Sequence, residues 1–458
     1  MSTYRADTIV ACATPVGRGA IAIVRWSGRD ALAIARRVFL PRLPGPIEPW
    51  RMRLGTVVTS VEGRPIDEAM GVYFPAPHSF TGEDTFEVHS HGSPVVVEQV
   101  VASAIAAGAR AAERGEFSRR AVLNGKMDLV QAEAVADLVD ARIVGGAQAA
   151  WRQLQGALSR EIASIRDEVI AALAGIEARV DFTDDELPEP DTGLLQASIA
   201  AVRGRIHGLL DGFVAARRQR EGIRVVFSGR PNAGKSSLVN RLLGFGRMIV
   251  SPEPGTTRDV VEETVEIDGV AFVLADTAGI RETGSAAEAE AVTRAQGALA
   301  EADVRVLVVD ASGPRDDGAI LSWKQQAPGT ALLVWNKVDL VAAGARGGLA
   351  AHATALPVLE CSALTGEGCE GLARALVEAG RSGGEAGPAA ISRLRHRAAL
   401  EKAAGMLEKA EEMAAREDGS ELAAFELRAA AAALAEICWP LDNEEVLDRI
   451  FSEFCIGK

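Results

Sequence analysis

The chain has 458 residues, a formal net charge of −14 and only 5% aromatic residues. This length exceeds what one hydrophobic core usually serves, so about three domains are expected. The negative charge excludes broad electrostatic attraction to nucleic acid, and the few aromatic residues argue against base-stacking platforms. Any contact with RNA therefore needs a local basic patch or the surface of another subunit.

The compartment is indicated by the cysteines and by the apolar runs. The five cysteines are scattered and never form a CxxC pair, which predicts reduced thiols. The first residues lack a basic region followed by an apolar run, and no apolar stretch is long enough to span a bilayer. A cytoplasmic protein without a membrane segment is expected.

Residues 1–120 predict an α+β domain. Between residues 8 and 27, short apolar runs broken by Gly and Pro predict two strands, and a helical pattern starts at Arg29. The next elements expected are strands at 69–74 and 85–89 and a helix near 94–107.

Two later stretches predict long helices. From Gln131 to about Arg220, apolar residues recur at steps of three and four, with an acidic, proline-bearing break at 184–192. Helical periodicity resumes from about Ala390 to Phe454. Residues 121–220 and 380–458 are therefore predicted to form the two parts of one split helical domain.

Between these two parts, residues 221–379 alternate β-rich runs with helical segments, which is the pattern of a doubly wound sheet. The five β-rich runs are 223–228, 271–275, 304–310, 331–335 and 356–360. The whole prediction is a multidomain α/β and α protein with an inserted α/β domain, a topology that is tolerated when the ends of the insert lie close together.

The segment Gly229-Arg-Pro-Asn-Ala-Gly-Lys-Ser236 matches the phosphate-loop pattern GxxxxGK[ST], between a predicted strand and a predicted helix. In such a loop, backbone amides surround the phosphates, Lys235 reaches the outer phosphates and Ser236 binds magnesium. The candidate nucleotide-binding residues of this loop are Asn232, Ala233, Gly234, Lys235, Ser236 and Ser237.

Asp276-Thr-Ala-Gly279 follows another predicted strand. Asp276 is expected to hydrogen-bond water on the magnesium ion, and the Gly279 amide to face the γ-phosphate. Thr277 and Ala278 complete this candidate turn. The next residue is Ile280, where small signalling GTPases carry a water-orienting Gln, so the hydrolytic group must come from elsewhere.

A candidate switch segment, Gly255-Thr-Thr-Arg-Asp259, lies between the phosphate loop and Asp276. Thr257 is the candidate for the second protein ligand of magnesium, and an ordinary polar loop is the alternative.

Asn336-Lys-Val-Asp339 follows a further predicted strand, and Ser362-Ala363 lies ahead of a glycine-bearing loop. The Asp339 carboxylate can accept two hydrogen bonds from the ring N–H and amino group of guanine, whereas adenine would present an acceptor to it. Asn336 and Lys337 belong to the same motif, and Ser362 and Ala363 are expected to back the base. These motifs, in this order, predict a domain that binds and hydrolyses GTP.

Four regions outside these motifs carry a family resemblance: residues 13–20, residues 79–84 with 91–92, residues 115–118 through 124–133, and the terminus 449–458, which ends in Cys-Ile-Gly-Lys. On these regions the chain resembles, essentially end to end, the bacterial tRNA uridine-modification GTPases of the MnmE (TrmE) family. The resemblance implies a homodimer whose N-terminal domain binds a one-carbon tetrahydrofolate, such as the 5-formyl or methylene derivative.

The same resemblance implies four folate contacts: Arg25, Glu87, Lys126 and Lys458. Arginine and lysine can hold the carboxylates of the glutamyl tail, and Glu87 can accept hydrogen bonds from the amino and N–H groups of the pterin. Taken singly, each such residue is more often a solvated or ion-paired surface group.

The family resemblance also implies that potassium does the work of the missing Gln by neutralising charge in the transition state. The implied ligands are Asn232, Ser251, Glu253 and Thr256. Pro252 and Pro254 stiffen this segment, which either preorganises its carbonyls or alters their spacing.

The implied water-orienting glutamate falls on Glu288, with Glu290 as a rival because the surrounding residues depart from the family. Cys455 is expected beside the folate, either as a nucleophile or as a small buried residue. His89 and His91 form an HxH pattern for which a structural role is favoured over metal binding, because no third ligand motif lies nearby.

Arg217, Arg218 and Arg220 precede the inserted domain. These residues either contact tRNA or form a solvated hinge, and the hinge is favoured because short charge runs are usually surface-exposed.

The function implied by the resemblance is a potassium-stimulated GTPase. It would work with the flavoprotein MnmG (GidA) in a heterotetramer and add a carboxymethylaminomethyl or aminomethyl group to a tRNA wobble uridine. Whether glycine or ammonium is the second substrate stays open. The alternatives are a switch GTPase in ribosome assembly without folate chemistry and a folate enzyme with a degenerate G domain, which the intact nucleotide motifs oppose.

Overall fold

The structure is a computed structural model that describes residues 7–181, 192–248, 262–276, 297, 299–314, 316–326, 329–342, 356–381, 387–416, 419–439, 444–452 and 454–457. The chain forms two compact units. The first unit comprises residues 1–136, 153–202 and 402–458, and the second comprises residues 137–152 and 203–401. Each unit contains a seven-stranded sheet, so the protein is of mixed α/β type with a large helical part.

The sheet of the first unit has the strand order β3-β4-β5-β6-β2-β1-β7, antiparallel except for the β1–β7 pair. Its strands are β1 Ile9–Cys12, β2 Gly19–Ser27, β3 Phe39–Pro41, β4 Arg53–Val58, β5 Pro65–Phe74, β6 Thr85–Gly92 and β7 Arg110–Ala111. Its helices are α1 Ala31–Val38, α2 Pro94–Ala106 and α3 Glu116–Leu123. The predicted strands and helices are present, whereas β3, β4 and β7 were not predicted because they are short or lack apolar alternation.

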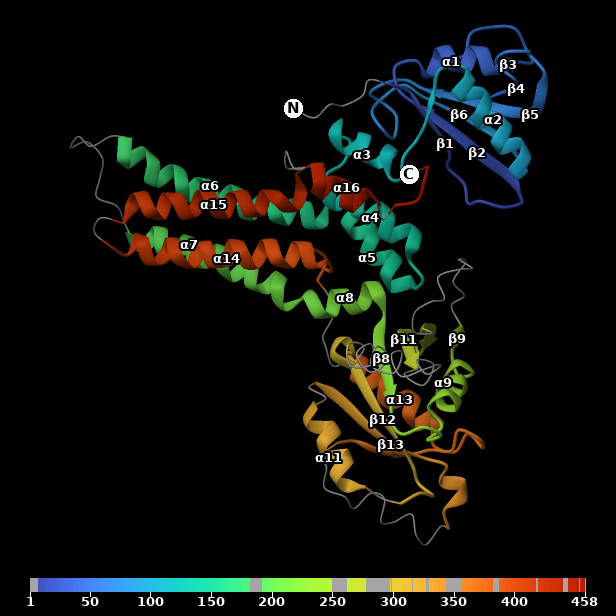
Figure 1. The fold of residues 1–458 in the computed structure, drawn as a ribbon. Coiled ribbons are helices and arrows are strands. Elements are labelled where there is room, and N and C mark those ends of the chain that lie inside the picture. The colour runs from blue at the N-terminus through green and yellow to red at the C-terminus, as the bar shows by residue number, and fades with distance from the viewer. Residues whose placement is uncertain are drawn as a thin grey trace, which may run out of the picture. The chain divides into compact units, whose positions relative to one another are not determined.

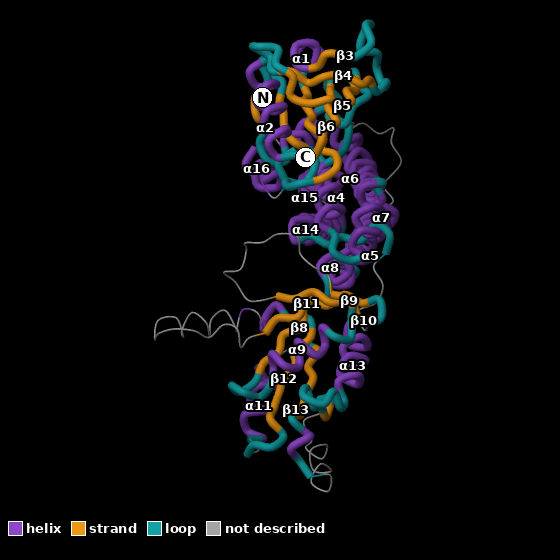
Figure 2. Tube along the Cα trace, turned by 90° about the vertical axis from the view of Figure 1, so that its right-hand side faces the viewer, coloured by secondary structure: helices purple, strands orange, loops and turns teal. Residues whose placement is uncertain are grey.

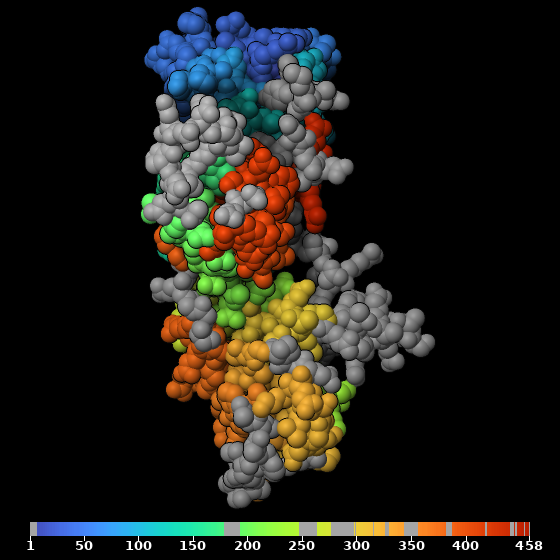
Figure 3. All heavy atoms as spheres, turned by 90° about the vertical axis from the view of Figure 1, so that its left-hand side faces the viewer, coloured from blue at the N-terminus to red at the C-terminus, as the bar shows by residue number. Residues whose placement is uncertain are grey.

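Helices α1 and α2 contribute to the core on one face of this sheet. Successive residues of a strand point to opposite faces, so Trp26 on β2 and Phe86 on β6 enter this core, where their rings stack with centroids 5.1 Å apart. Their sequence neighbours Arg25 and Glu87 therefore point to the other face. Figure 3 shows the blue atoms of this N-terminal part gathered in one compact mass.

The predicted long helices are also present. They are α4 Leu129–Asp140, α5 Val144–Leu154, α6 Ala157–Asp181, α7 Thr192–Asp211, α8 Phe213–Glu221, α14 Leu394–Ala414, α15 Ser420–Cys438 and α16 Glu444–Ser452. In the first unit α15 lies along α6 (Figure 1), where Arg428 forms an ion pair with Glu177. The predicted break at 184–192 lies outside the described residues except for Thr192. Among the described helices, none is long and apolar enough to cross a membrane.

The sheet of the second unit has the order β14-β13-β12-β8-β11-β10-β9. The strands are β8 Ile223–Ser228, β9 Arg247–Met248, β10 Glu262–Ile267, β11 Val270–Asp276, β12 Val304–Asp310, β13 Thr330–Asn336 and β14 Val358–Glu360. The pairs around β8 are parallel, and β9 and β10 add an antiparallel edge. Figure 2 shows β8 and β12 within this sheet. All five predicted runs are strands, whereas β9 and β10 were not predicted.

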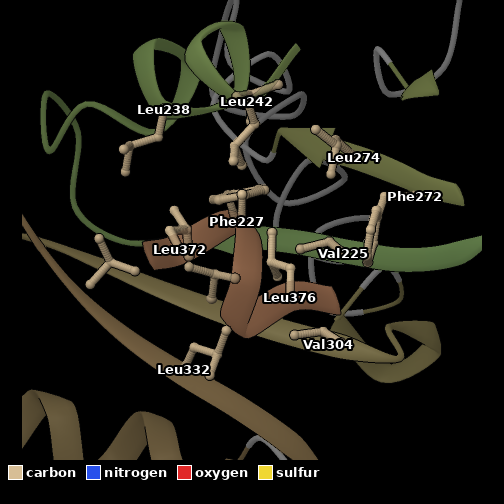
Figure 4. Packing of buried hydrophobic residues seen from close by; sticks show 14 of the residues in the cluster. Val225, Phe227, Leu238, Leu242, Phe272, Leu274, Val304, Leu332, Leu372 and Leu376 are labelled. Atoms are coloured by element: carbon tan, nitrogen blue, oxygen red, sulfur yellow. The ribbon is translucent and has the colours of Figure 1, made fainter. Parts of the chain in front are cut away.

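Helices cover both faces of this sheet. On one face, α9 Lys235–Leu243 and α13 Cys369–Arg381 pack around Phe227, as Figure 4 shows with Leu238, Leu242, Leu372 and Leu376. On the other face, α11 Asp317–Gln326 contributes Ile320 and Trp323 to a second cluster with Leu307. Because apolar side chains leave both faces, the strands are nearly continuous apolar runs, which is typical of a parallel sheet.

One expectation about the helices needs correction. Arg217 and Arg218 at the end of α8 are 30% and 15% exposed and are not simply solvated, because both donate to Oδ1 of the buried Asp303, at 2.6 and 3.1 Å. The backbone N–H of Arg224 on β8 donates to the other oxygen of Asp303 at 3.0 Å. Arg220 lies 3.9 Å from Asp137, a carboxylate that is 13% exposed. A buried carboxylate therefore ties α8 to the start of the sheet.

Candidate functional site

The phosphate loop, residues 229–236, runs from β8 into α9, where the carboxyl end of a parallel strand meets a helix N-terminus. Gly229 has φ 143° and Gly234 has φ 92°. A Cβ at Gly229 would collide with the carbonyl oxygen of Val308, and one at Gly234 with Nδ2 of Asn336. Both glycines are therefore required by backbone conformation and by space. Asn232 also has a positive φ, 62°, and its side chain is exposed.

Lys235 is held in place within this loop. Its side chain is buried, and Nζ donates to the carbonyl oxygens of Gly229 and Arg230 at 3.0 and 3.1 Å. The ammonium group is thus positioned inside the curve of the loop, where it can meet the outer phosphates of a nucleotide. Ser236 and Ser237 lie on the exposed first turn of α9.

The predicted base-binding residues are brought together beside the phosphate loop. Asn336 ends β13 and is 1% exposed. Its Nδ2 donates to the carbonyl oxygen of Ala233 at 2.8 Å, and its Oδ1 accepts from the backbone N–H of Ala363 at 3.0 Å. The Ser362 hydroxyl donates to Oδ1 of Asp339 at 2.5 Å. One buried amide therefore joins the phosphate loop to the base-backing loop, and Ser362 orients the carboxylate expected to bind guanine.

Asp310 is a site residue that the motif analysis missed. Lys337 has φ 64°, and its Nζ donates to Oδ2 of Asp310 at 2.7 Å. Burial alone would raise the pKa of Asp310, but hydrogen bonds from Lys337 and Ser312 outweigh it and hold the pKa below its ordinary value. Both strands were predicted, but their pairing, in which Asp310 lies opposite Asn336, was not, so no signal in the sequence indicated this contact.

Several predicted site residues lie outside the described residues: Ser251, Glu253, Thr256, Thr257, Thr277, Ala278, Gly279, Glu288, Glu290 and Lys458. The backbone of Asp276 ends β11, next to β8, while its side chain is not among the described ones.

A second candidate site is a pocket of about 500 Å³ on the face of the N-terminal sheet opposite α1 and α2. It is lined by Arg25, Trp50, Phe74, His78, Ser79, Phe80, Thr85, Glu87 and Lys126. Three of the four predicted folate contacts thus lie around one cavity, while Trp50, Phe74, His78 and Phe80 were not predicted.

The polar centre of the pocket is an ion pair. Arg25 and Glu87 are direct register partners on β2 and β6, and Arg25 Nε donates to Glu87 Oε1 at 2.7 Å. Burial alone would raise the pKa of Glu87, but the hydrogen bond with His89 and the charge of Arg25 hold it below its ordinary value. The Arg25 guanidinium also lies 5.6 and 5.9 Å from the ring centroids of Phe80 and Phe117, which fixes its plane.

A buried ionic cluster supports the segment Ser79–Asp84 that lines this pocket. Arg120, 3% exposed, donates to Asp7 and Glu116 at 2.6 and 2.9 Å and lies 3.3 Å from Glu83. The Ser27 hydroxyl donates to the same Glu83 at 2.7 Å. Burial alone would raise the pKa of Glu116, but Arg110 and Arg120 hold it below its ordinary value. Arg120 therefore links three separate segments behind the pocket.

The chain terminus returns to the same unit. Ile456 forms a β-bridge with Arg114, and a Cβ at Gly457 would collide with the carbonyl oxygen of Cys12. Cys455 is exposed and all five cysteines are free, so the alternative that Cys455 is a buried structural residue is wrong. The ring of His91 contacts Asp67 at 2.8 Å, and that of His89 contacts Glu87 at 3.2 Å, which supports structural roles for both histidines.

The doubly wound sheet, the phosphate loop and the Asn336–Asp339 loop define a P-loop GTPase. A family model described as "GTP-binding protein TrmE N-terminus" matches residues 8–126, and one described as "MnmE helical domain" matches residues 129–455. The chain belongs to the MnmE family of tRNA modification GTPases. GTP and Mg²⁺ are the ligands that a GTPase of this family implies.

Curated relatives agree with this assignment over their whole length. The tRNA modification GTPase MnmE of Chloroflexus aurantiacus is 43% identical, covering 99% of this chain and 100% of its own. The protein of the same name from Symbiobacterium thermophilum is 43% identical, covering 99% of both chains. The solved G domain of the T. maritima FeoB iron transporter is 29% identical over 34% of this chain and 98% of its own, with a TM-score of 0.27, which is too low to carry an argument.

Proposed function

We propose that this protein modifies tRNA in a GTP-dependent reaction that uses a one-carbon tetrahydrofolate. In this proposal a homodimer acts with the flavoprotein MnmG in a heterotetramer. The product carries an aminomethyl or carboxymethylaminomethyl group at C5 of a wobble uridine. The observation that carries the proposal is the presence, in one chain, of a phosphate loop with a positioned Lys235, an Asp339 oriented by Ser362, and a pocket that joins Arg25, Glu87 and Lys126.

The pocket residues fit a reduced folate. Glu87, kept ionised by Arg25 and His89, can accept hydrogen bonds from the ring N–H and amino groups of a pterin. Arg25 and Lys126 supply positive charge for the carboxylates of a glutamyl tail. Bound there, the folate would supply the carbon that is added to the uridine. Lys458 and Cys455, at the chain terminus, are proposed to complete this site, with Cys455 exposed and available as a nucleophile.

The hydrolytic machinery is proposed to use potassium. Asn232 lies in the phosphate loop with a positive φ and an exposed side chain, a position from which its amide oxygen can meet a cation beside the phosphates. Ser251, Glu253 and Thr256 are the other proposed ligands, and Glu288 is proposed to orient water. A monovalent cation there supplies charge neutralisation of the kind that an arginine finger provides in other GTPases.

The domain arrangement belongs to the same proposal. Residues 1–120 are proposed as the folate-binding domain, 221–379 as an inserted G domain, and 121–220 with 380–458 as the two parts of one helical domain. GTP hydrolysis would then act as a conformational driver of the distant folate site, in the manner of other nucleotide switches.

The test is steady-state GTP hydrolysis at fixed ionic strength in potassium and in sodium, for the natural chain and for Asn232→Ala. We expect strong stimulation by potassium in the natural chain and its loss in the variant. Equal rates in both salts would overturn the potassium site, with Pro252 and Pro254 as the reason, and would leave the GTPase intact. Absence of tetrahydrofolate binding by the full chain would overturn the folate part and favour a switch GTPase.

A further inference from the structure

Trp50 is a backbone outlier. In the described part of the chain, four residues other than glycine have a positive φ: Trp50, Asn232, Asp268 and Lys337. Asn232 and Lys337 belong to the nucleotide site. Asp268 forms with Gly269 the two-residue turn between β10 and β11, where Asp-Gly is a favoured pair. Neither explanation applies to Trp50, whose φ is 60° and whose bulk makes this conformation costly.

The side chain of Trp50 is an outlier as well. It is 60% exposed, so most of a large apolar ring forgoes the stabilisation that burial would give. The strained residue is held from outside its own loop, because its backbone N–H donates to the carbonyl oxygen of Tyr73 on β5 at 2.9 Å. Its ring packs against Phe74 edge to face, with centroids 5.0 Å apart and an interplanar angle of 79°.

The strained backbone and the exposed side chain of Trp50 place its indole in the wall of the pocket. Trp50 lines the cavity with Arg25, Glu87 and Lys126. Because Phe74 contacts the indole at an angle of 79°, the ring is fixed in orientation without being covered. Strained residues of this kind persist where the surrounding structure enforces them and cluster at ligand sites.

We propose that Trp50 is a specificity-determining residue of the pocket, and that its indole is the platform on which the planar ring system of the pterin stacks. This inference rests on the proposed folate function and deepens it. The charged groups of the pocket bind other parts of the folate. Glu87 binds the donors at the edge of the pterin ring, and Arg25 and Lys126 bind the carboxylates of the glutamyl tail. Trp50 then selects for the face of the ring, which Glu87 does not contact when it binds the edge.

The experiment is isothermal titration of the full chain with 5-formyltetrahydrofolate. Trp50→Asn removes the ring but tolerates a positive φ, so the backbone conformation is kept. Trp50→Phe retains an aromatic face. The matched control is Trp151→Phe on α5, which removes another exposed indole that does not line the pocket. GTP hydrolysis and light scattering are measured on each variant to report folding and oligomeric state.

We expect the Kd to rise about tenfold in Trp50→Asn, to rise no more than about threefold in Trp50→Phe and to stay unchanged in Trp151→Phe. Quenching of indole fluorescence on binding should disappear in Trp50→Phe and persist in the control. Normal binding by Trp50→Asn would overturn the platform and leave the folate function standing. A Trp50→Asn variant that binds normally but dissociates into monomers would show instead that Trp50 is an interface residue. Absence of binding by the natural chain would overturn the folate function and the platform together.

Discussion

The nucleotide site and the N-terminal pocket are built in different ways. The phosphate loop is one continuous segment whose own glycines and whose own carbonyl oxygens position Lys235. The pocket instead combines residues from β2, β5, β6 and the loops at residues 50, 78–80 and 126, and an ion pair across two strands forms its centre. A site coded by adjacent residues depends on local backbone conformation, whereas a site assembled from distant segments depends on the interactions that hold these segments together.

The largest effect is expected at Arg120, which holds together the segments behind the N-terminal pocket. Arg120→Met should destabilise the N-terminal sheet by about 3 kcal/mol, because it removes the buried cation shared by Glu83, Glu116 and the partly exposed Asp7. Arg110 still pairs with Asp7 and Glu116 in this variant. Hydrogen exchange of the amides of β2 and β6, read by mass spectrometry, measures this loss. Arg120→Lys, which keeps the charge but not the planar fork, should be intermediate. Natural exchange rates in Arg120→Met would show that the pocket needs no such support.

This first effect should also depend on pH. The pKa values of Asp7 and Glu116 are below their ordinary values in the folded chain. Their ion pairs therefore stabilise the fold fully above about pH 4.5, and this stabilisation is lost as the pH falls through the folded-state pKa values. The difference between the natural chain and Arg120→Met should be constant from pH 8 to about pH 5 and shrink below about pH 4. A difference that grew in acid would contradict the assignment.

The next effect tests whether the base loop acts locally. Asp339→Asn should weaken GTP binding by on the order of 10³-fold, because an amide offers a donor where guanine needs an acceptor. Xanthosine triphosphate, which has a carbonyl in place of the amino group, should bind to Asp339→Asn more tightly than it binds to the natural chain. The control is Asp268→Asn in the β10–β11 turn, where Asn tolerates the positive φ of 49°. Equal affinities for GTP in Asp339→Asn and the control would remove Asp339 from the site.

The phosphate loop itself is expected to give a slightly smaller effect on the rate. Lys235→Met should lower GTP hydrolysis by on the order of 10²–10³-fold, because the charge that faces the outer phosphates is removed. Lys324→Met on α11, a lysine of the same sheet domain, is the matched control and should hydrolyse GTP normally. If both variants retain full activity, the buried position of Lys235 is structural only.

The smallest effect concerns the ion pair in the pocket. The pKa of Glu87 is below its ordinary value because of His89 and Arg25, so its contribution to stability is present above about pH 4.5 and is lost as the pH falls through the folded-state pKa. The melting temperatures of the natural chain and Glu87→Gln should therefore differ by a constant amount near neutral pH and converge in acid. The partners of Glu87, Arg25 and His89, are a fifth to a quarter exposed. Solvent therefore weakens this effect relative to that of Arg120→Met. Melting temperatures of the two proteins that stayed equally far apart in acid would contradict this role of Glu87.

The sequence predicted the two kinds of site to different extents. Gly229, Gly234 and Lys235 were predicted with their roles in the phosphate loop, because a short motif between a strand and a helix determines the backbone. Arg25, Glu87 and Lys126 were predicted only through the family resemblance, since nothing in a single sequence indicates that β2 and β6 are neighbours. Trp50 carried no signal at all, because a tryptophan beside a proline has no characteristic pattern and its strain exists only after β5 has formed.

Two strands and several side-chain contacts were also not predicted from the sequence. The edge strands β9 and β10 escaped prediction because β9 is only two residues long and β10, with the sequence Glu-Glu-Thr-Val-Glu-Ile, has only two apolar residues. Asp310 was part of a predicted strand, but its contact with Lys337 depends on the register of two strands that lie about twenty-five residues apart. The ion pairs of Arg217 and Arg218 were missed because their partner Asp303 is distant in sequence.

The Asp303 contact also has a mechanical consequence. Since one carboxylate binds two side chains of α8 and the backbone of β8, the end of this helix and the start of the sheet share a single anchor. Loss of the Asp303 carboxylate would therefore release both elements at once, because no second carboxylate takes part in these three hydrogen bonds.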